Sequence, residues 1–300
     1  MTCAPERRRH GRSAVLALLL CLPWALSIAG AAPERHCLWE VRGEHNTVYL
    51  LGSVHMLSAQ DGTLPREMTD AYERAGALVM ELDLNDADVE SMLGTTIEST
   101  MLPEDQSLSD VLGPQLFAAF MARAEPLGIE ATLAERLQPW FAAMLLEQLK
   151  LASSGLAADS GVDMQLAHRA QVDHKPIIAL ETVAEQLGYF SQLTRPQQID
   201  FLRTTLDELD KQGSDTATMV RAWRQGDVSE LERLMREDAA KSPELYRVLT
   251  TDRNRKWLPR IDAMLHDSRD YLVVVGALHL VGRDGLVELL RQQGHTVTQR

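Results

Sequence analysis

The chain has 300 residues, of which 43 are acidic and 30 are lysine or arginine, so its formal net charge at pH 7 is −13. This balance argues against nucleic acid and anionic membrane surfaces as partners, because phosphate binding needs a basic surface. The length allows one large α/β domain or one domain with an insertion, and three cysteines cannot form a disulfide framework.

The first 31 residues have the parts of an export signal. Four arginines lie within residues 7–12, a mostly apolar stretch covers 13–28, and Ala29-Gly30-Ala31 is a cleavage signal. We predict cleavage before Ala32 and a periplasmic or secreted mature protein. Removing four arginines and one glutamate, a net +3, moves the charge from −13 to −16. The apolar run is short for a membrane span, so a retained N-terminal anchor is the less favoured alternative.

The mature chain is predicted to begin with a β-β-α-β block. Residues 38–41 and 47–51 are two strands of a hairpin around a turn at 44–46. Pro65 opens a helix that runs to Ala75, since proline is favoured in a first helical turn. A short apolar strand follows at 78–82.

Two long helical stretches follow, with one strand between them. Residues from about 87 to 170 repeat apolar residues at spacings of three and four, most clearly over 108–124 and 133–151. Residues 175–180 form a strand, and residues 183–265 are helical again. Breaks in this second stretch are expected at Pro196, Gly213, Gly226 and Pro243.

The chain is predicted to end with a strand at 271–275, a helix at 285–292 and a strand at 295–298. Strands therefore cluster at both ends of the chain, with one near the middle. This order predicts the α/β class: a central mixed β-sheet with flanking helices and large helical insertions, within one domain from 32 to 300.

One short pattern occurs after two of these strands. Gly52-Ser53-Val54-His55 follows the strand 47–51, and Gly276-Ala277-Leu278-His279 follows the strand 271–275. Glycine permits close approach of a ligand, and ligands of open α/β sheets lie beyond the carboxyl ends of strands. If both strands belong to one sheet, His55 and His279 form a two-histidine site. The alternative is that each histidine is hydrogen-bonded within its own loop.

Three acidic residues are candidates for the same site. Glu81 lies in the strand 78–82, and Glu181 directly follows the strand 175–180. A buried glutamate is costly unless it is paired or bound to a cation, and imidazole with carboxylate is common in hydrolytic metal sites. Asp163 begins a predicted helix. The alternatives are solvent-facing glutamates and, for Asp163, capping of that helix.

The pair Arg253-Asn254 lies on a helix just before the strand 271–275. An arginine there is suited to binding a carboxylate or to stabilising an oxyanion. The alternative is a surface salt bridge.

Together these segments resemble the TraB/GumN/Tiki family, and most of all its GumN-like bacterial branch. The paired G-x-x-H motif is the hallmark of that family, and the order of the segments matches over nearly the whole mature chain. Ser53 stands where many members have threonine. The matching segments are Leu38-Trp39-Glu40-Val41, residues 49–56, Leu180-Glu181-Thr182 with Gln186, Arg253-Asn254 with Trp257, and residues 275–280 with Gly282 and Gly285.

The resemblance implies an α/β core related to ChaN-like and erythromycin-esterase-like proteins. The animal Tiki members are described as divalent-metal-dependent proteases that cleave the amino terminus of a secreted signalling protein. By resemblance, the site comprises the metal ligands His55, His279 and Glu81, with Arg253 as a further catalytic residue. We expect the site to be supported by Gly52, Gly276, Asp163, Glu181 and Asn254.

Two hypotheses of different classes follow. In the first, the protein is an exported hydrolase, a peptidase in which Mn²⁺, Co²⁺ or Zn²⁺ activates water and polarises the scissile carbonyl of a peptide or protein substrate. A variant of it is a metal-independent, esterase-like reaction with a histidine as general base. In the second, the protein is a non-catalytic periplasmic binding protein. We expect no nucleic-acid partner and no membrane span after signal removal, and the oligomeric state is left open.

Overall fold

The computed structural model describes Met1 and residues 35–83, 98–209 and 212–300. The predicted export signal with its cleavage site lies outside these residues, as does the beginning of the first predicted helical stretch, residues 87–97. Within the described ranges, each helix is too short or too polar to cross a bilayer.

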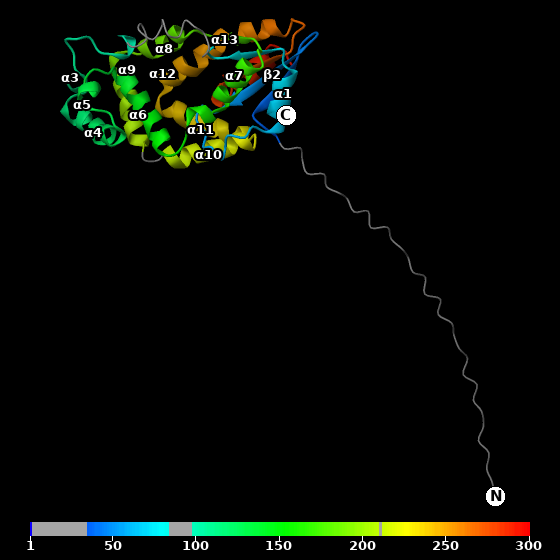
Figure 1. The fold of residues 1–300 in the computed structure, drawn as a ribbon, viewed down its shortest axis with the longest axis horizontal. Helices are drawn as coiled ribbons and strands as arrows, with labels where there is room; N and C mark the ends of the chain where they lie inside the picture. The colour runs from blue at the N-terminus through cyan, green and yellow to red at the C-terminus, as the bar shows by residue number, and fades with distance from the viewer. Residues whose placement is uncertain (2–34, 84–97, 210–211) are drawn as a thin grey trace. The chain divides into compact units, whose positions relative to one another are not determined.

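The fold contains a six-stranded mixed sheet, which lies on the right of the folded part in Figure 1 beside α1 and α7, while α3, α4, α5, α6 and α9 lie on the left. Its strands stand in the order β4-β3-β5-β2-β1-β6, in which β1 is antiparallel to β2 and β6 while β2, β5, β3 and β4 are parallel. The predicted α/β class is confirmed. The strands are β1 (Leu38–Arg42), β2 (Thr47–Ser53), β3 (Ala77–Met80), β4 (Ile177–Ala179), β5 (Tyr271–Gly276) and β6 (Val297–Gln299).

The two strands that precede the G-x-x-H motifs are neighbours in this sheet. β2 and β5 run parallel, with Val48 beside Tyr271 and Ser53 beside Gly276. Both strands are apolar along almost their whole length and are buried, as parallel strands covered on both faces require. The motifs therefore leave the sheet at the same edge.

Helices of the first predicted helical stretch are shorter than the apolar pattern suggests. The predicted run 108–124 is divided at Gly113, whose φ of 75° ends one helix, and the run 133–151 is divided before Pro139, which starts a new helix. The helices before β4 are α1 (Arg66–Arg74), α3 (Leu108–Leu112), α4 (Pro114–Ala124), η1 (Glu125–Leu127), α5 (Ala131–Ala134), α6 (Pro139–Ser153), η2 (Ala158–Ser160) and α7 (Val162–Val172).

The second helical stretch breaks near all four predicted positions. Pro196 lies in the first turn of α9, Gly226 lies between α10 and α11, and Pro243 begins α12. Gly213 is the second residue of α10, which begins at Gln212 after α9 ends at Glu208, so this break is confirmed as well. The helices after β4 are α8 (Val183–Ser191), α9 (Arg195–Glu208), α10 (Gln212–Arg224), α11 (Val228–Lys241), α12 (Pro243–Tyr246), η3 (Arg247–Thr251), α13 (Asp252–Met264), η4 (Ala277–His279) and α14 (Leu286–Gln292).

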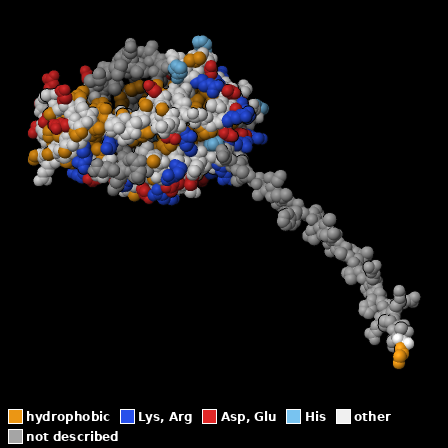
Figure 2. All heavy atoms as spheres, turned by 60° about the horizontal axis from the view of Figure 1, so that its bottom comes forward, with side chains coloured by type: hydrophobic (Ala, Val, Ile, Leu, Met, Phe, Trp, Pro, Cys, Tyr) orange, Lys and Arg blue, Asp and Glu red, His pale blue; other side chains and the backbone are white. Residues whose placement is uncertain are grey.

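The two helical stretches share a second hydrophobic core. Leu146 of α6 and Leu202 of α9 are fully buried in one cluster with residues of α3, α4 and α5, separate from the core around the sheet. On the face drawn in Figure 2, acidic and basic side chains are interspersed. Exposed pairs such as Arg233 with Glu230 (2.8 Å) add little to stability.

Gly52 is required by packing at the end of β2. A Cβ atom there would lie 3.0 Å from Ala277 Cα and 3.3 Å from Cys37 Cβ. We therefore expect Gly52→Ala to destabilise the protein by about 1–3 kcal/mol, as overpacking does, measured by urea denaturation.

Gly188→Ala is the matched control, because a Cβ at Gly188 in α8 would meet nothing within 4 Å. This change should leave stability unchanged or raise it by up to about 1 kcal/mol. Equal stability of Gly52→Ala and the wild type would contradict the packing argument.

Candidate active site

Three side chains from distant parts of the sequence meet at the carboxyl ends of the central strands. A Cβ atom built on Gly276 would lie 3.5 Å from His55 Nε2, 3.5 Å from His279 Cδ2 and 3.6 Å from Glu81 Oε1. We call the space around this position the Gly276 niche, bounded by Gly276, His55, Glu81 and His279. The structure thus brings the two motif histidines and one glutamate together.

Glu81, which directly follows β3, accepts its two shortest hydrogen bonds from Gly276 and Arg253. Its Oε1 accepts the Gly276 N–H at 2.8 Å, and its Oε2 accepts Arg253 Nη2 at 2.6 Å. Burial alone would raise the pKa of Glu81, but the positive charges of Arg253 and His55 and the N–H of Gly276 lower it to about 2. The interpretation of Glu81 as a solvent-facing carboxylate is wrong, because the residue is 9% exposed. It is an ionised carboxylate with one oxygen facing the niche.

Arg253 of α13 joins two buried glutamates. Besides Glu81 it contacts Glu181, with Nη2 2.5 Å from Oε1 and Nε 3.3 Å from Oε2. Burial raises the pKa of Glu181, whose side chain is fully buried, so a solvent-facing role is wrong for it as well. Arg253 itself is 6% exposed. The alternative that Arg253 forms a surface salt bridge is therefore wrong, because its ion pairs with Glu81 and Glu181 are buried.

Every N–H of Arg253 is used in this arrangement. Nη1 donates to the Leu249 carbonyl (3.1 Å), in the π-helical turn η3, and approaches His279 Nε2 at 3.2 Å. With the three bonds to Glu81 and Glu181, these contacts occupy all five donors of the guanidinium. Arg253 therefore has no donor left for an oxyanion.

Asn254 sets the tautomer of His279. Its Oδ1 lies 2.7 Å from His279 Nδ1, and its Nδ2 donates to the carbonyls of His279 (3.1 Å) and Asp284 (2.8 Å). Nδ1 then carries the proton, and Nε2 is free to accept from Arg253. Burial is the main reason that the pKa of His279 falls to about 3. The ring also packs on Trp257, with centroids 4.7 Å apart.

Asp163 orients His55 in the same way. Its Oδ2 lies 2.8 Å from His55 Nδ1, which turns Nε2 towards the niche. The negative charge of Asp163 is the main cause that raises the pKa of His55 to about 9, although the side chain is 65% exposed. Gly161 is the N-cap of α7 and Asp163 lies in the first turn, so the capping alternative is wrong.

Two contributors carry roles that the sequence analysis did not assign. Gln186 of α8 donates to Glu81 Oε2 at 3.4 Å and to Glu181 Oε1 at 3.2 Å. Trp257 lies under both Arg253, 4.6 Å from the ring centroid, and His279. Both residues belong to the segments that carry the family resemblance, and the capping box Thr182–Glu185 at the start of α8 was the local signal for a helix beside Glu181.

The chemical types of these side chains, two imidazoles and one carboxylate, suit a divalent cation. Both imidazoles have Nδ1–H bonded to an oxygen, the usual arrangement in metal sites, and Glu81 is ionised. In position, His55 Nε2 and Glu81 Oε1 face the niche, while His279 Nε2 contacts Arg253 and lies 4.0 Å from Glu81 Oε1. Across the described parts of the chain, no three His, Cys, Asp or Glu side chains are already arranged around one ion position.

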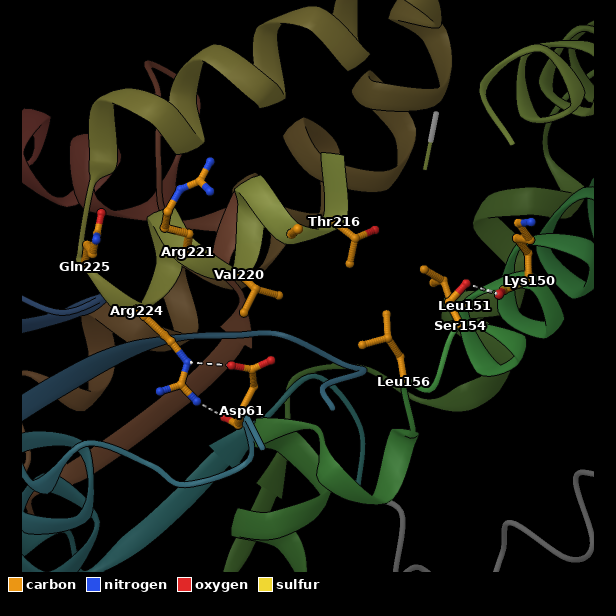
Figure 3. A pocket seen from close by; sticks show the side chains of 11 residues that line it. Asp61, Lys150, Leu151, Ser154, Leu156, Thr216, Val220, Arg221, Arg224 and Gln225 are labelled. Atoms are coloured by element: carbon orange, nitrogen blue, oxygen red, sulfur yellow. Dashed lines mark hydrogen bonds and ion pairs between the residues drawn. The ribbon is translucent and has the colours of Figure 1, made fainter. Parts of the chain in front are cut away.

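A separate cavity of about 490 Å³ lies between α6, α10 and the loop after His55 (Figure 3). Asp61 and Arg224 pair across its floor at 3.3 Å, and none of the niche residues lines it. Its wall is apolar at Leu151, Leu156 and Val220. This cavity is therefore distinct from the Gly276 niche.

Comparison with known proteins gives one family. The sequence profile of the TraB/PrgY/gumN family matches residues 37–299. The uncharacterized protein YbaP of Escherichia coli is 28% identical over 243 residues, 81% of this chain and 87% of YbaP. The metalloprotease TIKI2 of Xenopus tropicalis is 24% identical over 313 aligned positions, 87% of this chain and 59% of TIKI2. An uncharacterized protein of Treponema pallidum is 24% identical over 301 positions, 93% and 90% of the two chains. No solved structure matches the chain.

Acid is expected to destabilise the protein through His279. The folded chain keeps this residue neutral, with a pKa of about 3, whereas the unfolded chain takes up a proton below the ordinary value of 6.5. Because the unfolded state binds the extra proton, the free energy of unfolding falls as pH drops from 6.5 towards 3. We therefore expect the free energy of unfolding to depend less steeply on pH in His279→Gln than in the wild type, by up to about one proton, as pH falls from 7 to 5. Urea denaturation of chelator-treated protein measures this slope. Identical slopes would contradict this assignment.

Proposed function

The chain belongs to the TraB/PrgY/gumN family, and we propose that it is an exported, metal-dependent hydrolase that cleaves peptide bonds at the Gly276 niche. The observation that carries this proposal is the meeting of His55 Nε2, Glu81 Oε1 and the His279 ring within 3.6 Å of one point. Relatives named metalloproteases, 23% and 24% identical to this chain, support the same reaction class.

His55, His279 and Glu81 would hold the divalent cation, Mn²⁺, Co²⁺ or Zn²⁺. A cation bound there supplies an activated water and polarises the scissile carbonyl. Asp163 and Asn254 each bond to an Nδ1, which leaves Nε2 as the ligand atom of each ring. His55, whose pKa is raised to about 9, has to release its Nε2 proton when a cation binds. For His279 to serve as a ligand, its Nε2 has to exchange the contact with Arg253 Nη1 for the cation.

Arg253 is proposed as a positioning residue. Its five N–H groups bond to Glu81, Glu181, His279 and the Leu249 carbonyl. Arg253 therefore acts by holding Glu81 and His279 in place. The carboxylate of Glu81 keeps its second oxygen free of Arg253 and directed at the niche, where it can take a proton from water.

Loss of either histidine should remove both the metal and the activity. We expect His55→Ala and His279→Ala to lose bound Mn, Co or Zn, and to cleave a peptide library about 10²–10⁴-fold more slowly than the wild type. Metal analysis and a cleavage screen across several divalent cations measure both effects. His266→Ala is the matched control, since His266 is exposed and pairs with Glu44.

Unchanged metal content and cleavage in both variants would eliminate this mechanism. Cleavage that needs His55 but survives chelation would favour the esterase-like variant, in which His55 is the general base. Thermal stabilisation by a ligand without any turnover would favour a binding protein.

Asp163 should control metal affinity through His55. Asp163→Asn keeps the size of the side chain but removes the negative charge that accepts the Nδ1–H of His55 and orients the ring. We expect the dissociation constant of the cation to rise about 10–100-fold, as for other residues that orient metal ligands. Competition titration with a chromophoric chelator measures the affinity, and Asp159→Asn, in η2 nearby in sequence, is the control. An unchanged constant would show that Asp163 does not orient a ligand.

A further inference from the structure

Ser53 is a buried hydroxyl without a partner. The residue is 3% exposed, and its Oγ makes no hydrogen bond to any residue that the structure describes. A buried polar group left in this state costs about 1–3 kcal/mol. Such a group is expected to bind a water or a ligand.

The sheet register directs this hydroxyl at the niche. Ser53 stands beside Gly276 on parallel neighbouring strands, so their side-chain directions lie on the same face of the sheet. Neighbouring strands are about 4.8 Å apart. The Ser53 side chain therefore leaves the sheet on the same face, and beside the same point, from which a Cβ at Gly276 would approach His55 Nε2 and Glu81 Oε1.

The backbone conformation at Gly276 does not require glycine, yet the missing side chain leaves the niche open. Its φ of −49° and ψ of 136° are accessible to any residue. A Cβ would make only ordinary contacts of 3.5–3.6 Å with His55, His279 and Glu81. Gly52, in contrast, is fixed by close packing. The absence of a side chain at Gly276 thus preserves a space rather than a backbone conformation.

We propose that the Gly276 niche holds the reacting water and that Ser53 Oγ is its third hydrogen-bond partner. In the protein without a bound cation, Glu81 Oε1 accepts one proton of the water, and His55 Nε2 is the second partner. The Ser53 hydroxyl both donates and accepts, so it completes the bonding of the water in either protonation state of His55. A buried water typically has about three such partners.

The chemical role of this water rests on the proposed function. Its oxygen bonds to the carbonyl carbon, one proton passes to Glu81, and that proton reaches the leaving nitrogen as the C–N bond breaks. The water site itself depends only on the contacts described above, and it can be tested without a substrate.

A crystal structure of chelator-treated protein tests the site directly. We expect one ordered water within about 2.7–3.2 Å of Ser53 Oγ, His55 Nε2 and Glu81 Oε1, and no such water in Gly276→Ala, where the new methyl group fills the space. An empty niche in the wild type, or a water that does not contact Ser53, would overturn the proposal.

Stability and turnover give a second, independent test. Ser53→Ala removes a hydroxyl that bonds only to the proposed water, so its melting temperature should stay close to that of the wild type, while turnover falls at least about 10-fold and Ser53→Thr restores it. Gly276→Ala should fold with a normal melting temperature and lose at least about 100-fold in turnover. Gly188→Ala, the same change in open space, should alter neither.

The failures of the two proposals are distinguishable. A lower melting temperature in Ser53→Ala together with full turnover would show that the hydroxyl is structural and overturn the water site. A water bound as described in a protein that cleaves no peptide under any cation would support the site and reject the hydrolase.

Discussion

The site depends on one buried arginine. Arg253 donates to Glu81, which directly follows β3, and to Glu181, two residues after the end of the neighbouring strand β4. It also contacts His279, which follows β5. A buried charge is tolerated only when it is fully paired, and here the guanidinium has no unused donor. Removing Arg253 would leave two carboxylates repelling each other in the interior. The positions of Glu81 and His279 therefore depend on this cluster.

The sequence was most informative where local chemistry decides the structure. The hairpin of β1 and β2, the helix after Pro65 and the apolar strand β5 follow from residue patterns within ten positions. The apolar periodicity did not resolve the interruptions at Gly113 and Pro139, because a helix that ends and restarts keeps the same spacing of buried side chains. Nor did it show that α6 and α9, from different helical stretches, pack together.

Part of the candidate site could be predicted from the sequence in the same way. A glycine and a histidine after each of two apolar strands suggested that His55 and His279 meet, and the parallel register of β2 and β5 brings them to one edge. What local pattern could not supply is orientation. The tautomer of His279 follows from Asn254, and the direction of Ser53 follows from its neighbour on β5, 223 positions later. Such facts exist only after the sheet has formed.

The place of β5 in the sheet has a consequence for biosynthesis. This strand lies between β3 and β2, although it is among the last elements to leave the ribosome. Until it arrives, the nascent polypeptide has two unconnected strand pairs, with His55 on one and Glu81 on the other. The Gly276 niche therefore cannot form before β5 has been synthesised. The order of the strands thus delays assembly of the candidate site until synthesis is almost finished.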